Sequence, residues 1–99
     1  MNDITPAELK ERQQQQQVPV IIDVREPWEY EESRIEGSRN IPLGELPAQI
    51  ENLEDLKDQE VVVHCKGGGR SATAKALLQQ HGFGKVRNLL GGITAYNAG

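Results

Sequence analysis

The chain has 99 residues, of which 36% are hydrophobic and 26% charged, with a formal net charge of -4. This length predicts one domain over residues 1–99 with a single modest core. No apolar run approaches the roughly 20 residues of a membrane span, and the acidic balance argues against nucleic acid or an anionic membrane as the main partner. The amino terminus lacks the basic and apolar regions of a secretion signal, so we expect a cytoplasmic protein.

The cysteine content excludes two further classes of protein. Cys65 is the one cysteine, so it forms no intrachain disulfide, and no Cys/His cluster has the spacing of a zinc site. We therefore expect neither a metal nor a cofactor.

The charges are unevenly distributed along the chain. All 15 Asp and Glu residues lie within residues 1–60. Residues 61–99 contain none, but hold five bases: Lys66, Arg70, Lys75, Lys85 and Arg87. This pattern has two interpretations, either a surface cross-linked by salt bridges or a segment around the lone cysteine that favours anions.

The hydrophobic pattern predicts helices alternating with strands. A first helix begins at Thr5-Pro6, where Thr5 can cap it, and runs through Arg12 into a stretch of five glutamines. The expected strands are residues 20–24, 40–43, 61–64 and 86–90. The other expected helices are residues 27–32, 45–56 and 93–97, and a helix that begins at Ala72 and ends near Gly82. Two of the strands are apolar on both faces, and this alternation predicts an α/β fold with a parallel sheet.

The segment after strand 61–64 carries the clearest chemical signal. Cys65 stands at the carboxyl end of a buried strand, where parallel sheets usually place their chemistry. The residues that follow are Lys66, Gly67, Gly68, Gly69, Arg70 and Ser71. Three glycines let backbone N–H groups converge on one point, and the next helix directs its N-terminus at that same point. We therefore expect a thiol with a lowered pKa, with Lys66 and Arg70 adding positive charge.

Other interpretations of this segment are weaker. A lone cysteine is often a small buried hydrophobe, but packing alone requires no glycine-rich loop. The glycine spacing matches neither the dinucleotide-binding motif nor the P-loop. His64 precedes Cys65 on a strand and so points to the opposite face, which argues against direct activation of the thiol. His81, near the end of the next helix, is expected to be polar surface.

Four segments of the chain, in order, resemble those of a rhodanese domain. Residues 22–30 (IDVREPWEY) are similar to the family's D-V-R-x-x-x-E segment, and residues 34–43 (RIEGSRNIPL) to its G-H-I-P-G-A-x-N-I-P-L segment. The cysteine loop resembles the family's active loop, and residues 86–96 (VRNLLGGITAY) its closing V-x-N-L-x-G-G-x-x-A-W. The chain departs from the family pattern at Arg34, Glu36 and Tyr96, where the family often has His, Pro and Trp. These departures bear on the choice of partner more than on the chemistry.

The resemblance implies a fold and an activity. It implies a three-layer α/β/α domain with a five-stranded parallel sheet in the order 3-2-4-5-1, the first strand lying at the extreme amino terminus. It also implies a sulfurtransferase in which Cys65 takes sulfane sulfur from a donor such as thiosulfate, becomes a persulfide, and passes the sulfur to a nucleophilic acceptor. Lys66 to Ser71 would form the cradle, and Lys66 and Arg70 would steer an anionic donor. Asp23 and Arg25 would line or brace the pocket, unless Arg25 pairs with Glu29.

Alternative functions and partners stay open at this point. Phosphatases and arsenate reductases of the same fold place five residues between cysteine and arginine, whereas Cys65 and Arg70 enclose four, and a shorter ring fits a single sulfur better. A non-catalytic interaction module is the other alternative.

The sulfur acceptor also has two interpretations. The cysteine loop and closing segment look similar to those of rhodanese domains attached to adenylyltransferases, which suggests a sulfur-carrier protein as acceptor. A stand-alone donor for cofactor or tRNA sulfur chemistry is equally open.

Overall fold

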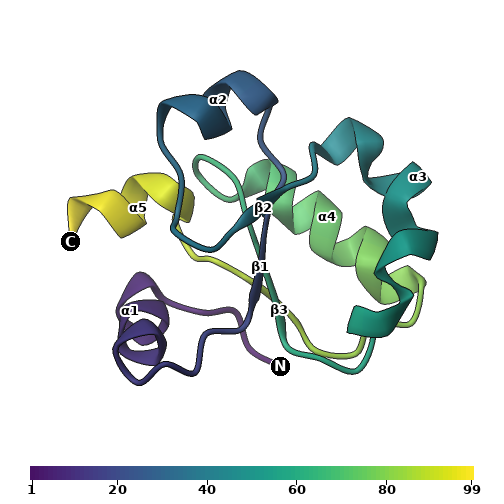
Figure 1. Cartoon of the computed structure of the whole chain (residues 1–99), viewed down its shortest axis with the longest axis horizontal. Helices are drawn as coiled ribbons and strands as arrows, with labels where there is room; N and C mark the ends of the chain where they lie inside the picture. The colour runs from purple at the N-terminus through teal and green to yellow at the C-terminus, as the bar shows by residue number, and fades with distance from the viewer.

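The computed structural model describes all 99 residues and builds them around one parallel sheet (Figure 1). Its strands are β1 (Val20–Asp23), β2 (Arg39–Asn40), β3 (Val61–His64) and β4 (Val86–Asn88), in the order β2-β1-β3-β4. Every residue of β3 is buried, and so is β1 from Ile21 to Asp23. The two-sided apolar runs therefore form the central strands of a parallel sheet, as the sequence predicts.

Helical segments cover both faces of this sheet. They are α1 (Pro6–Gln14), α2 (Pro27–Glu32), η1 (Leu43–Glu45), α3 (Leu46–Gln49), η2 (Ile50–Leu56), α4 (Gly69–Gln80) and α5 (Gly92–Ala98), where η marks a 3₁₀-helix. The larger of two core clusters joins one face of the sheet to α3, η2 and α4, and the smaller joins the other face to α1 and α5. The predicted three-layer α/β/α class is confirmed (Figure 1). No helix is both long and apolar enough to cross a membrane.

The sheet has four strands, so the prediction of five is wrong in number. The expected first strand is a single parallel bridge between Ile4 and Leu89, at the β4 edge of the sheet. Ile4 N donates to Asn88 O (3.0 Å) and Leu90 N to Ile4 O (2.9 Å), after which Pro6 begins α1. Because the helix starts so soon, one residue is all that pairs. The order of the remaining strands is the predicted one. The expected strand 86–90 is shortened to β4, whereas β2 shares only Asn40 with the expected strand 40–43.

The expected single helix over residues 45–56 is also wrong in kind. The structure has a short α-helical turn, α3, between the two 3₁₀ segments η1 and η2. The buried residues of η2 are Ile50, Leu53 and Leu56, which recur every three positions. A 3₁₀-helix has three residues per turn, so this spacing places all three side chains on one face, against the core.

Salt bridges connect the basic and the acidic parts of the chain. Lys75 pairs with Asp3 (2.6 Å), and Arg87 pairs with both Glu8 (2.6 Å) and Glu60 (2.8 Å). Arg70 pairs with Glu29, as described below. The salt-bridged interpretation of the charge pattern is thus confirmed for three of the five bases, whereas Lys66 and Lys85 form no ion pair.

Candidate active site

Cys65 follows β3 directly and is only 1% exposed. Its side chain lies on the face of the larger core cluster, with Val63 and Ala74. The helix α4 starts at Gly69, three residues earlier than predicted, so Arg70 and Ser71 belong to its first turn. The loop proper is therefore very short, and it carries the chain directly from the cysteine into a helix N-terminus.

Hydrogen-bond donors converge on the sulfur of Cys65. Gly68 N lies 3.1 Å from Sγ, and Ser71 N lies 3.4 Å from it. Gly68 is the residue that caps α4, with φ +116°, and it has no side chain to accept the free N–H groups of the first turn. Sγ accepts from the Ser71 N–H in place of such a capping group. The predicted convergence of backbone N–H groups is therefore present in the geometry.

The Ser71 hydroxyl is shared among three acceptors. Its Oγ lies 3.4 Å from Cys65 Sγ, 3.1 Å from Gly68 O and 2.6 Å from Asn88 Oδ1. Asn88 also donates from Nδ2 to Gly68 O (3.2 Å). A hydroxyl has one proton, so Asn88 competes with the sulfur for it while anchoring the loop. Sequence reasoning missed Asn88, whose only signal was its place in the closing segment.

These contacts set the protonation of Cys65. Burial raises the pKa of the thiol, but hydrogen bonds from Ser71 Oγ and N, Gly68 N and Gly67 N lower it by more, so its pKa lies below the ordinary value. The donors are aimed at a single atom that carries negative charge, as in an oxyanion hole. Such a site stabilises a thiolate, or the terminal sulfur of a persulfide anion.

Backbone N–H groups at the start of α5 bind carbonyl oxygens of the cysteine loop. Ile93 N donates to Cys65 O (2.9 Å) and Thr94 N donates to Lys66 O (3.1 Å). Gly91 and Gly92 precede them with φ +74° and +61°, and a Cβ at Gly92 would lie 2.6 Å from Cys65 O. Only glycine fits there. The sequence predicts a turn at these glycines, but gives no sign that this turn supports the cysteine loop.

The two arginines near the loop are each paired with a carboxylate. Arg70 forms a two-point ion pair with Glu29 of α2 (2.7 and 3.1 Å), and this pair lowers the pKa of Glu29 to about 2. Arg25 binds Asp23 through Nε and Nη2, and its Nη2 also donates to Ser33 O (2.6 Å). The considered pairing of Arg25 with Glu29 is therefore wrong, because Arg25 is bound to Asp23 and Glu29 to Arg70.

Asp23 and Arg25 lie beside the site rather than on the sulfur. Asp23 is fully buried, and its carboxylate accepts hydrogen bonds only from Arg25. Arg25 in turn borders a surface pocket together with Lys66 of the loop. Both residues fix the segment that leads from β1 into α2. His64 lies near Asp23, with Nε2 3.7 Å from Oδ2, and burial lowers its pKa. It does not contact the Cys65 thiol, which agrees with the sequence argument that the two side chains point to opposite faces.

The comparisons with known proteins place the chain in a family. The model of the rhodanese-like domain matches residues 5–99, so the chain belongs to the rhodanese-like domain family. A sulfurtransferase from Allochromatium vinosum is 33% identical over 96 residues, covering 97% of this chain and 88% of that protein. The crystal structure of a rhodanese-related protein from Thermoplasma volcanium has a TM-score of 0.86 and 34% identity, covering 99% of this chain and 92% of that one.

A second group of relatives is much longer than this chain. The tRNA uridine(34) hydroxylase of Cronobacter sakazakii is 37% identical over 81 residues, which is 78% of this chain but 23% of that protein. Together with the sulfurtransferase homologue, the family match supports a rhodanese-type sulfurtransferase, which requires a sulfur donor and a sulfur acceptor in general.

Proposed function

We propose that this chain carries sulfane sulfur as a persulfide on Cys65, moving it from a donor such as thiosulfate to a thiophilic acceptor or a sulfur-carrier protein. The observation that carries this proposal is the set of N–H donors from Gly68 and Ser71 on Cys65 Sγ. The thiolate attacks the outer sulfur of thiosulfate, the S–S bond breaks, and sulfite leaves with its electron pair. The product is Cys65–S–S⁻, whose terminal sulfur the acceptor then attacks.

The loop residues have distinct roles in this proposal. Gly67, Gly68 and Ser71 supply hydrogen bonds to the sulfur, and Gly69 begins the helix that aims the Ser71 N–H. Lys66 forms no ion pair and is the cation available to a donor. Arg70 ties α4 to α2 through Glu29, which supports a positioning role rather than one in binding an oxyanion. This geometry disfavours phosphatase or arsenate chemistry, which needs the arginine free to hold the oxyanion.

Intact-mass measurement after incubation with thiosulfate tests the proposal. We expect the chain to gain the mass of one sulfur atom, and cyanide or dithiothreitol to remove it. The Cys65→Ser variant should stay folded and gain nothing, because Cys65 is the only thiol. Activity of that variant above a tenth of the wild-type rate would contradict the proposal. A wild-type chain that never gains sulfur and has an ordinary thiol pKa would favour the interaction module.

The other sequence-based predictions are part of this proposal. They are a single domain over residues 1–99, a cytoplasmic location, and partners similar to those of the rhodanese domains of sulfur-carrier-activating adenylyltransferases. The tRNA uridine(34) hydroxylase relatives keep a role in tRNA chemistry open alongside the sulfur-carrier acceptor.

A further inference from the structure

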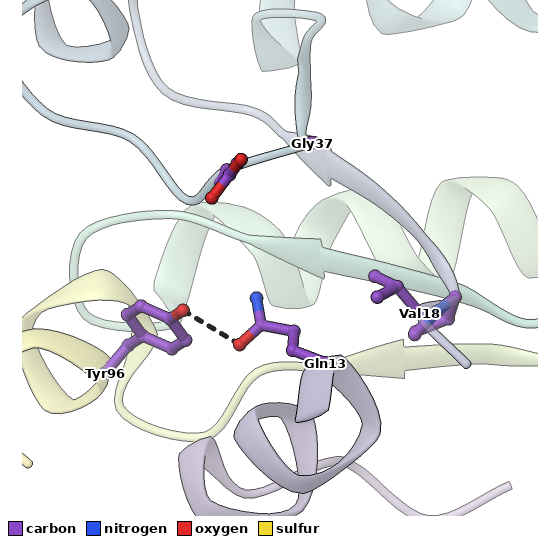
Figure 2. Close-up of a pocket in the computed structure, with 6 residues that line it drawn as sticks. Gln13, Val18, Gly37 and Tyr96 are labelled. Carbon is purple, nitrogen blue, oxygen red and sulfur yellow. Dashed lines mark hydrogen bonds between the residues drawn. The ribbon is translucent and has the colours of Figure 1, made fainter. Parts of the chain in front are cut away.

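The surface has two cavities, and one of them includes part of the cysteine loop. The larger, about 580 Å³, lies between the end of α1, Val18-Pro19, Glu36-Gly37 and Tyr96, whose hydroxyl donates to Gln13 (3.0 Å; Figure 2). It contains no loop residue. The smaller cavity, about 270 Å³, is bordered by Lys66, by α2 and by α5. Of the two cavities, only the smaller one adjoins the cysteine loop, through Lys66.

The charges around the smaller cavity largely cancel. Arg25 and Glu29 both border it, but each is already in an ion pair. Arg25 is paired with Asp23, and Glu29 is paired with Arg70. The charged lining residues without an ion-pair partner are Lys66 and Glu32, one of each sign. Thr94 and Asn97 of α5 add uncharged polar groups, and Trp28, 63% exposed, adds an aromatic face.

The wider surroundings of Cys65 are acidic rather than basic. Residues 23–32 and the loop 65–71 contain three cations and five carboxylates, a net charge of -2 before the thiolate is counted. Glu26 and Glu31 are exposed on the α2 side and have no ion-pair partner. The carboxylates of α2 and β1 neutralise both arginines, so Lys66 is the one cation of this arrangement without an ion-pair partner.

We propose that the site selects sulfane-sulfur donors that carry a cationic group and no net negative charge, in preference to inorganic dianions such as thiosulfate. This inference rests on the proposed function. The acidic surroundings and the thiolate repel a dianion, and one free lysine offsets only part of that repulsion. A zwitterionic donor has an anionic sulfur end for Lys66 and an ammonium group for Glu32 or the face of Trp28.

A series of donors with matched chemistry tests this selection. Thiosulfate, methanethiosulfonate and aminoethanethiosulfonate all present a sulfane sulfur on an oxidised sulfur, and carry two, one and no net negative charges. In each case the Cys65 thiolate attacks the outer sulfur, the S–S bond breaks, and sulfite or a sulfinate leaves with the electron pair. The kcat/KM of each donor is measured in wild type, in Glu32→Gln, and in Glu51→Gln, a control on η2 that borders neither cavity.

The expected results differ in sign between donors. Raising the salt from about 0.01 M to about 0.1 M shortens the Debye length from about 30 Å to about 10 Å, so thiosulfate kcat/KM should rise in wild type. At low salt, Glu32→Gln should raise the thiosulfate value about threefold and lower the aminoethanethiosulfonate value by a similar factor, while Glu51→Gln changes neither.

Two results would overturn the selection and leave the sulfurtransferase proposal standing. One is a thiosulfate kcat/KM that falls as salt rises. The other is a Glu32→Gln variant that behaves like Glu51→Gln with all three donors. If no donor of the series loads sulfur on Cys65, both the selection and the proposed function fail.

Discussion

Two helices begin beside the same loop, and they act on it in opposite ways. The first turn of α4 directs N–H groups at the sulfur of Cys65, whereas the first turn of α5 directs them at the carbonyl oxygens of Cys65 and Lys66. Each start has glycine in the left-handed region: Gly68 caps α4, Gly91 caps α5, and Gly92 is the first residue of α5. One helix stabilises charge on the reacting atom, and the other fixes the backbone that carries it.

This difference explains how so short a loop can hold a buried thiolate. The carbonyl oxygens of Cys65 and Lys66 face α5, so they are kept away from the sulfur, where they would repel negative charge. The amides of Gly68 and Ser71 then face the sulfur with no carbonyl oxygen beside them. Changes at the α5 start should therefore displace the whole loop, and changes at the α4 start should act mainly on the charge of the sulfur.

The largest combined effect on rate and stability is expected at the α5 start, from Gly92→Ala. The new Cβ would overlap the Lys66 carbonyl and approach Cys65 O to 2.6 Å, in a backbone conformation that costs an alanine about 1 kcal/mol. The loop must move, and a shift of about 1 Å can lower the rate about 100-fold. Steady-state sulfur transfer and Tm should both fall. Gly44→Ala, where a Cβ meets nothing within 4 Å, is the matched control and should leave both unchanged.

A glycine inserted between Gly68 and Gly69 should act on the α4 start alone. The insertion gives Cys65 and Arg70 five intervening residues and separates the Gly68 N–H from the Ser71 N–H. Losing one well-placed donor costs about 10²–10³ in rate at oxyanion holes, so a comparable fall in sulfur transfer is expected. Circular dichroism checks folding, and a glycine inserted between the exposed Gln15 and Gln16 is the control. If the loop variant is folded and transfers sulfur at the wild-type rate, the length of the loop does not determine the sulfur chemistry.

The contrast between these helices also shows what the sequence could and could not predict. Local signals were sufficient for the central strands β1 and β3, for the Thr5 cap of α1 and for the glycine cradle around Cys65, because each depends on neighbouring residues. The support from α5, the Asn88 anchor and the Glu29–Arg70 pair join residues at least 17 positions apart. Their geometry arises only when the sheet brings β1, β3 and β4 together. For the same reason the single cross-strand bridge at Ile4 could not be distinguished from a full strand.

An intermediate effect on the sulfur is expected from Ser71→Ala. The variant keeps the Ser71 backbone N–H but loses the hydroxyl, which lies closer to Asn88 Oδ1 (2.6 Å) than to Sγ (3.4 Å). Because the sulfur has only a share of that proton, we expect the thiol pKa to rise and the rate to fall about fivefold. The pH profile of thiol alkylation measures the pKa.

The control for this variant is Ser38→Ala, whose hydroxyl donates to Ile35 O away from the loop. If both serine variants have the same thiol pKa as wild type, the hydroxyl belongs entirely to Asn88. The charge on the sulfur is then stabilised by backbone N–H groups alone.

The smallest effect on the sulfur is expected from Arg70→Ala. Although Arg70 stands in the first turn of α4, its guanidinium is bound to Glu29, so the thiol pKa should rise only slightly, and the main loss should be in stability. The pair lowers the pKa of Glu29 from 4.5 to about 2. A carboxylate with a depressed folded-state pKa stabilises the fold at pH above its unfolded value, and this stabilisation is lost as pH falls toward the folded value.

The stability difference between wild type and Arg70→Ala should therefore depend on pH in a defined direction. Urea unfolding at neutral pH should show a loss of about 1–2 kcal/mol, since Glu29 is nearly buried and loses its charged partner. The difference should shrink as the pH drops from 4.5 toward about 2, because the wild-type carboxylate then becomes protonated as well. Arg70→Lys keeps the charge but cannot form both hydrogen bonds, and should lie between the two. A loss that stays constant with pH, together with a large rise in the thiol pKa, would contradict this prediction. Arg70 would then stabilise charge on the sulfur together with the backbone N–H groups at the start of α4.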